Sequence, residues 1–154
     1  MRRTRRSIIG AALLLSVSMA AASCAGSAAS PTPKPLISLG VENCAFLALQ
    51  LADEGRLPTI STALAAEDLG AAAAALPAGV GHGRQALLPN SSSPLLNDLD
   101  ERMGTLNYHW LEIALGIESG DAGHALAAIP KATASYQLVR QELQRLEAAG
   151  NGCP

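Results

Sequence analysis

Hydrophobic residues recur at helical spacing along the C-terminal two thirds of this chain. Two stretches each carry one continuous apolar stripe with intervals of three or four residues. The stripes comprise Leu95, Leu99, Met103, Leu106, Trp110, Ile113 and Ile117, and then Ala125, Ile129, Ala132, Tyr136, Val139, Leu143 and Leu146. Such intervals place apolar side chains on one side of a helix. Sustained alternation, which would indicate strands, is missing, so the pattern predicts an all-α domain.

Capping residues mark the ends of these two helices. Ser93 followed by Pro94 is typical of a helix start. Gly120 and Asp121 predict a tight break, with Asp121 capping the last helix. Gly150 is the expected C-terminal cap.

Pro130 falls inside the last predicted helix. A proline lacks the backbone donor of an interior helical position and clashes with the preceding turn. The sequence therefore predicts a kink or a break near Ala128.

Two further helices are predicted before residue 77. The first covers 38–54 and is ended by the segment "EGRLP"; the second covers 60–76, with Thr59 as its candidate N-cap. The connection 77–93 is rich in Gly, Pro and Ser and is long for a compact domain. Within it, Leu87 and Leu88 are expected to dock on the helices.

A second apolar line, opposite the main stripe, runs along the helix that begins at Pro94. It comprises Tyr108, Leu111 and Leu115. A helix that is apolar on two sides is either covered on both or presents a patch to a partner. We expect the first helix, the connection 77–93 or a neighbouring turn to cover this line. If the line is exposed, we predict that a protein or a lipid-like ligand docks there.

The N-terminus is organised differently. Four arginines lie among the first six residues, and an uncharged, mostly apolar segment follows at 8–22. That segment is shorter than the ~20 residues of a membrane-spanning helix. Small residues follow it, so the pattern predicts a cleaved signal peptide at 1–23. The motif "TRRSII" also fits a twin-arginine signal, and the export route stays open.

Two cleavage sites are compatible with the residues around Cys24. "AAA" at 20–22 suits ordinary signal peptidase, which would cut before Ser23. "AASC" at 21–24 resembles the lipobox of bacterial lipoprotein precursors. This resemblance covers only residues 1 to about 35. It implies cleavage between Ser23 and Cys24, a diacylglycerol on the thiol of Cys24, and anchoring at the outer face of the cytoplasmic membrane.

The count of cysteines favours the lipoprotein interpretation. Ordinary cleavage would leave three thiols in an oxidising compartment, and one would be unpaired. Lipidation of Cys24 leaves Cys44 and Cys153, which can form a disulfide. In an up-down four-helix bundle, the start of the first helix and the end of the last lie at the same end. The disulfide and the four-helix count therefore support each other.

The segment between the anchor and the domain reads "AGSAASPTPKP". Its small residues and three prolines favour extended backbone, so residues 24–35 are predicted to form a flexible tether. The remaining residues, 36–154, are enough for one helical domain with a core of its own.

Charge and composition argue against nucleic acid as a partner. Every acidic residue follows position 41, so removal of residues 1–23 leaves a net charge of 7 − 13 = −6. A nucleic-acid surface needs cations and stacking platforms, and the chain has only four aromatic residues. The excess of Arg over Lys and the abundance of Ala are typical of a GC-rich bacterial genome, such as an actinobacterial one.

The residues after the tether do not form a recognisable catalytic or metal-binding set. His82, His109 and His124 lack the partners that nucleophilic catalysis needs. His109 and Glu112 are three residues apart, but we place them on the flank or outside of their helix, as a solvated polar pair rather than a metal site. Tyr108 and His109 are adjacent and cannot both face one haem iron.

We therefore expect a membrane-anchored, non-enzymatic helical module that binds a partner, such as an envelope protein, or a ligand at the cell envelope, and that needs neither metal nor cofactor. The alternative is a small-ligand carrier, for metal or haem, that uses His82, His109 or His124.

Overall fold

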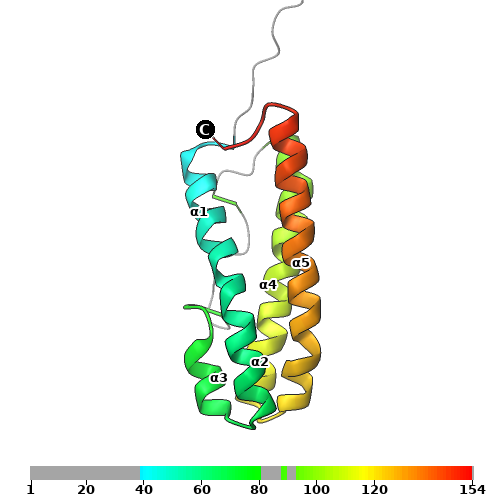
Figure 1. Cartoon of the computed structure of the whole chain (residues 1–154). Coiled ribbons are helices and arrows are strands. Elements are labelled where there is room, and N and C mark those ends of the chain that lie inside the picture. The colour runs from blue at the N-terminus through cyan, green and yellow to red at the C-terminus, as the bar shows by residue number, and fades with distance from the viewer. Residues whose placement is uncertain (1–38, 81–87, 90–92, 154) are drawn as a thin grey trace, which may run out of the picture. The chain divides into compact units, whose positions relative to one another are not determined.

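The computed structural model describes residues 39–80, 88–89 and 93–153, so the predicted signal peptide and tether lie outside the described part. Regular structure within the described residues is entirely helical, which confirms the all-α class. In order, the elements are α1 (Val41–Ala52), the 3-10 turn η1 (Asp53–Arg56), α2 (Leu57–Ala65), α3 (Leu69–Ala75), the 3-10 turn η2 (Pro94–Leu96), α4 (Asn97–Glu118) and α5 (Ala122–Ala148) (Figure 1). Over these residues, no helix combines the length and the hydropathy that a bilayer span requires.

The first helical segment is longer than predicted. α1 passes through η1 directly into α2, so the predicted end at "EGRLP" is wrong (Figure 1). Pro58 lies in the first turn of α2, where its missing N–H interrupts little, and the tighter 3-10 turn accommodates Gly55 just before it. Thr59 consequently lies inside α2 and does not cap it. If α1, η1 and α2 count as one segment, the described residues contain four helical segments. The boundary between the first and second segments then lies near residue 67 instead of at 55–59.

Two turns at the same end of the helices share one geometry. Glu67 after α2 and Gly120 after α4 both have left-handed backbone, with φ of 57° and 77°. In the first turn, the N–H groups of Glu67 and Asp68 donate to carbonyls of α2 at 3.0 and 2.9 Å. In the second turn, those of Gly120 and Asp121 donate to carbonyls of α4 at 3.2 and 2.8 Å. Asp68 and Asp121 then cap α3 and α5 by accepting from the N–H three residues on, at 2.9 and 2.8 Å. The predicted cap at Asp121 is confirmed.

The predicted caps at Ser93 and Gly150 are also present. The Ser93 hydroxyl accepts from the N–H of Leu95 at 3.4 Å, and Pro94 opens the 3-10 turn that leads into α4. After α5, Gly150 has a φ of 75° and its N–H donates to the carbonyl of Glu147 at 2.9 Å. These ends therefore follow the sequence signals.

α4 and α5 form an antiparallel pair whose facing sides are the two predicted stripes. Every predicted position on α4 from Leu99 onward is buried, but Leu95 is exposed and Leu96 is buried in its place. On α5, Ile129 and Leu143 are only partly buried. The helices approach closely beside Gly116, where an added Cβ would lie 2.7 Å from the backbone nitrogen of Ala125.

Pro130 does not break α5, which is continuous from Ala122 to Ala148. Of the predicted kink or break near Ala128, the break is therefore wrong. Ala128 and Ala132, on either side of the proline, are buried in the core. Tertiary packing stabilises helices more than intrinsic propensity does. The burial of these two alanines therefore offsets the backbone hydrogen bond that Pro130 cannot form, and the helix continues.

The start of α1 and the end of the chain are covalently joined. Cys44 and Cys153 form a disulfide with a Cα–Cα distance of 5.7 Å, as predicted. Next to it, the N–H of Leu39 approaches the carbonyl of Gly152 at 3.4 Å. Figure 1 shows the start of α1 and the C-terminal end of the chain at the end of the helices opposite the two tight turns.

A buried chain of hydrogen bonds joins three helices inside the core. The indole Nε1–H of Trp110 on α4 donates to the Tyr136 hydroxyl on α5 at 3.0 Å. That hydroxyl donates in turn to the backbone carbonyl of Gln50 on α1 at 3.1 Å. Both aromatic side chains are fully buried, so Tyr136 is a structural residue of the core.

Part of the connection 77–93 packs on the helices. Leu88 is buried, and its N–H donates to the Asp100 carboxylate at 2.8 Å, so its predicted docking is confirmed. Leu87 lies outside the described residues. The hydrogen bond to Asp100 ties this connection to the first turns of α4.

Candidate functional site

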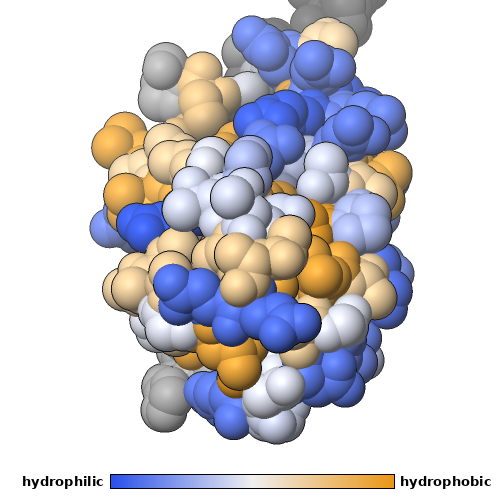
Figure 2. Space-filling view, turned by 60° about the horizontal axis from the view of Figure 1, so that its bottom comes forward, coloured by the Kyte–Doolittle hydropathy of each residue, from blue (hydrophilic) through white to orange (hydrophobic). Residues whose placement is uncertain are grey.

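The outward side of α4 carries the predicted apolar line. Tyr108, Leu111 and Leu115 are 57%, 37% and 50% exposed, so neighbouring segments leave a large part of each side chain in contact with solvent. Figure 2, in which the end with the tight turns is brought forward, shows apolar patches between charged groups on the surface. An exposed tyrosine and two exposed leucines within two helical turns form a candidate contact surface.

This line belongs to a longer seam along α4. Glu101, Gly104, Tyr108, Leu111, Leu115 and Glu118 follow one another at intervals of 3, 4, 3, 4 and 3 residues, and we call them the α4 seam. Alternating intervals of three and four are those by which one helix packs along another. The seam therefore has the shape of a helix-packing surface without a described helix on it.

Gly104 has no packing role within the described chain. A Cβ added at Gly104 would meet no atom within 4 Å. Gly116 on the same helix contrasts with it, because its added Cβ would clash with Ala125. A glycine inside a helix costs about 1 kcal/mol relative to alanine, so Gly104 weakens α4 without any gain in internal packing.

Both ends of the α4 seam are acidic. All five Lys and Arg residues in the described part form ion pairs with carboxylates; these pairs are Arg56–Asp53, Arg102–Glu142, Lys131–Glu112, Arg140–Glu54, and Arg145 with Asp98 and Glu142. Neither Glu101 nor Glu118 takes part in any ion pair within the described residues. The exposed apolar line thus lies between two carboxylates that no cation of the described chain neutralises.

His109 and Glu112 interact with each other on the side of α4 that faces α5. His109 Nδ1 lies 2.8 Å from Glu112 Oε2, and Lys131 Nζ lies 3.5 Å from the same oxygen. The hydrogen bond from His109 lowers the pKa of Glu112, against the opposing effect of burial, and the charge of Lys131 lowers it further. Both side chains are less than one fifth exposed, so the expected solvated pair is in fact largely covered.

Other candidate ligands do not join this pair. Within the described ranges, no group of three or more His, Cys, Asp and Glu side chains is close enough to hold a metal ion. The backbone N–H of His124 lies at the cap of α5, where it donates to Asp121. The ring of Tyr108 contacts the His109 ring edge-on, with centroids 5.6 Å apart. His82 lies outside the described residues, so the carrier alternative stays a prediction.

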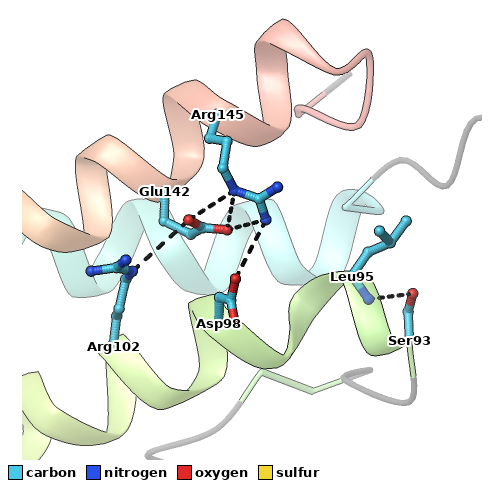
Figure 3. A network of polar contacts seen from close by, with 6 residues as sticks. All are labelled: Ser93, Leu95, Asp98, Arg102, Glu142 and Arg145. Atoms are coloured by element: carbon cyan, nitrogen blue, oxygen red, sulfur yellow. Dashed lines mark hydrogen bonds and ion pairs between the residues drawn. The ribbon is translucent and has the colours of Figure 1, made fainter.

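A buried carboxylate between α4 and α5 was not predicted. Glu142 is only 4% exposed, and both of its oxygens accept from Arg145 Nε, at 2.9 and 3.0 Å (Figure 3). Arg145 also lies 3.8 Å from Asp98, and Arg102 Nε lies 3.9 Å from Glu142. The hydrogen bonds from Arg145 lower the pKa of Glu142; burial opposes the shift, and the charges of Arg145 and Arg102 add to it.

A sequence signal for Glu142 exists in hindsight. It lies three residues after Val139 and four before Leu146, both on the core stripe, and three before Arg145. A charged residue at such a position is almost never fully buried unless it is paired. The pairing with Arg102 on another helix, however, requires the tertiary structure.

A small pocket opens beside this ion network. It has a volume of about 240 Å³ and is lined by Asp98, Glu101, Arg102, Thr105, Ser135 and Leu138. Ser135 is buried and contributes to the lining. The lining contains no histidine that would activate the Ser135 hydroxyl as a nucleophile. The pocket therefore supports no catalytic assignment.

The predicted lipidation and cleavage positions, Cys24 and Ser23, lie outside the described residues. The structure thus brings together Cys44 and Cys153, exposes the line Tyr108, Leu111 and Leu115, and pairs His109 with Glu112. Comparison with known proteins found no matching family model, no matching curated protein and no matching solved structure.

Proposed function

We propose that this protein is a bacterial envelope lipoprotein, anchored through Cys24 after a signal peptide at 1–23, that binds a partner protein through a helical domain. The domain is an up-down bundle of the segment α1–α2, the short return helix α3, α4 and α5. The disulfide joins the start of α1 to the end of the chain, and the two tight turns lie at the opposite end of the helices. A net charge of −6 after cleavage disfavours flat adsorption of the domain on an anionic bilayer.

The observation that carries the binding proposal is the exposure of Tyr108, Leu111 and Leu115 on one side of α4. Two leucines and a tyrosine exposed side by side cost solubility, and burying them against a partner is favourable by about 25 cal/mol per Å² of apolar surface. The same residues have no described contact that explains them as part of the core. We assign no enzymatic role, metal or cofactor to the domain.

Co-purification tests the binding proposal. The protein is recovered from its own membranes as the wild type, as Leu111→Asp and as Leu49→Asp, a matched control because Leu49 is 71% exposed on α1. A partner that is retained by the wild type and by Leu49→Asp, but lost with Leu111→Asp, supports the proposal. Identical profiles for all three, with unchanged helical circular dichroism, would contradict it.

The anchor is tested separately. Cells supplied with an alkyne-labelled fatty acid should label the wild-type protein and leave Cys24→Ser unlabelled. The variant should also leave the membrane fraction, because two acyl chains hold a protein stably on a bilayer and none does. Labelling that survives Cys24→Ser would show that the thiol of Cys24 is not the attachment point.

A further inference from the structure

We propose that the partner presents a helix to the α4 seam, and that this helix carries an apolar line between Lys or Arg residues. This inference rests on the proposed binding function and adds the chemistry of the partner. Its evidence is the spacing of the seam, the glycine within it, and the two carboxylates at its ends.

The spacing argues for a helix as the occupant. The intervals of 3, 4, 3, 4 and 3 residues keep all six seam positions on one narrow stripe of α4. A partner helix packs against such a stripe by inserting its own side chains between these positions. Gly104 leaves an open position in the stripe, because no atom of the described residues lies within 4 Å of where its Cβ would be. A bulky partner side chain fits over that position.

The charges argue for a basic partner. Glu101 lies seven residues before Tyr108, and Glu118 three residues after Leu115, so the carboxylates bracket the apolar line. Every Lys and Arg of the described residues is already paired elsewhere. No Lys or Arg of the described residues pairs with Glu101 or Glu118, so a partner with cations opposite them would complement their charge. Complementary charges steer encounter and set the register of the two helices.

The same charges exclude a second copy of this chain as the occupant. In an antiparallel pair, Glu101 of one copy would face Glu118 of the other, and in a parallel pair each would face itself. Both arrangements place like charges together, which costs free energy. A lipid surface is disfavoured for the same reason, because the leaflet surface is anionic and the seam is acidic.

Two synthetic helical peptides test the inference. Both carry leucines at intervals of 3 and 4 residues, with lysines at each end in one peptide and glutamates in the other. Their affinity for the whole, disulfide-oxidised protein is measured by fluorescence anisotropy at low and high salt. The variants are Leu111→Asp, the double variant Glu101→Gln with Glu118→Gln, and the control Leu49→Asp.

The lysine peptide should bind roughly tenfold more tightly than the glutamate peptide, since two exposed ion pairs replace two like-charge contacts. The double variant should reduce this difference to about twofold or less, as should high salt. Leu111→Asp should abolish binding of both peptides, and Leu49→Asp should leave it unchanged.

Different results would overturn the basic character of the partner and the role of the α4 seam as a binding surface. Equal affinities of the two peptides, both lost with Leu111→Asp, would overturn the basic partner and leave the binding surface standing. Failure of both peptides to bind, or binding that survives Leu111→Asp, would overturn the surface itself. Reversible dimers in sedimentation that Leu111→Asp dissociates would assign the seam to a second copy and overturn the inference.

Discussion

Trp110 donates its indole N–H to the hydroxyl oxygen of Tyr136 at 3.0 Å in the centre of the core. Because the same hydroxyl donates to the carbonyl of Gln50, one phenol connects α4, α5 and α1. Buried polar groups have lost their water and need such partners. These two hydrogen bonds fix how α1 lies against the α4–α5 pair, and therefore which side of α4 is left exposed.

Tyr136→Phe should lower the free energy of unfolding by about 1–3 kcal/mol. The substitution keeps the packed ring but leaves the buried N–H of Trp110 without an acceptor, which costs its full desolvation penalty. Urea unfolding followed by circular dichroism should show a lower midpoint with an unchanged slope. Tyr108→Phe is the matched control, since Tyr108 is exposed and its loss should stay within ~0.5 kcal/mol. Equal effects at both positions would contradict the account.

Glu67→Gly should stabilise the protein by roughly 0.5–1 kcal/mol. Glu67 holds a φ of 57° in a turn whose counterpart at α4–α5 has glycine at the same position. A glycine adopts this backbone without a clash, although its greater freedom in the unfolded chain offsets part of the gain. The converse variant, Gly120→Ala, should destabilise by about 1 kcal/mol, because it forces a Cβ into a φ of 77°. Thermal unfolding of the two variants should therefore shift in opposite directions.

Removal of the disulfide should lower stability more than any single core change. The Cys44–Cys153 link closes 109 residues, worth about 4–5 kcal/mol in the chain-entropy model. The double variant Cys44→Ala, Cys153→Ala should lose about 2–5 kcal/mol, measured by urea unfolding. Reductant should lower the midpoint of the wild type and leave that of the double variant unchanged. A wild-type midpoint indifferent to reductant would show that the link contributes nothing.

Stability should fall in acid partly through Glu142. The hydrogen bonds from Arg145 hold the pKa of this carboxyl below its ordinary value of 4.5, despite burial. A folded-state pKa below the unfolded one adds stability that is fully present above pH 4.5 and is lost as the pH falls through the folded pKa. Glu142→Gln should lower the free energy of unfolding by roughly 1–2 kcal/mol at neutral pH; the loss is kept this small because Arg145 is half exposed and solvent screens the pair. The variant should also lose less stability than the wild type as the pH falls. The exposed carboxylate of Glu147 on the same helix provides the control: Glu147→Gln should keep the wild-type profile.

The long stripes and most caps were predictable because they depend on local spacing. Asp121 and Gly150 act at their own helix ends, so the sequence around them suffices. The "EGRLP" boundary failed because Pro58 lies where a helix tolerates proline, and only packing decides whether the chain continues. The turn at Glu67 was missed because a glutamate in the sequence does not indicate left-handed backbone, unlike the glycine in the α4–α5 turn.

The candidate site was predictable in part. The line Tyr108, Leu111 and Leu115 follows from helical geometry, but its exposure depends on where the other helices lie. The burial of Glu142 was missed, although its main partner Arg145 lies only three residues away. Its contact with Arg102, forty residues away on another helix, depends on the tertiary structure. The pairing of Cys44 with Cys153 was accessible because so few cysteines leave few alternatives.

Photocrosslinking in living cells reports whether the α4 seam is the surface that binds the partner. A benzophenone amino acid replaces Leu111, and in a parallel strain it replaces Leu49, which lies on α1 and is more exposed, at 71% against 37%. The account predicts a covalent adduct with one envelope protein from position 111 only, mapped to a helix with Lys or Arg beside its apolar line. Absence of an adduct at 111, or the same adducts from both positions, would contradict the claim that α4 is the binding surface.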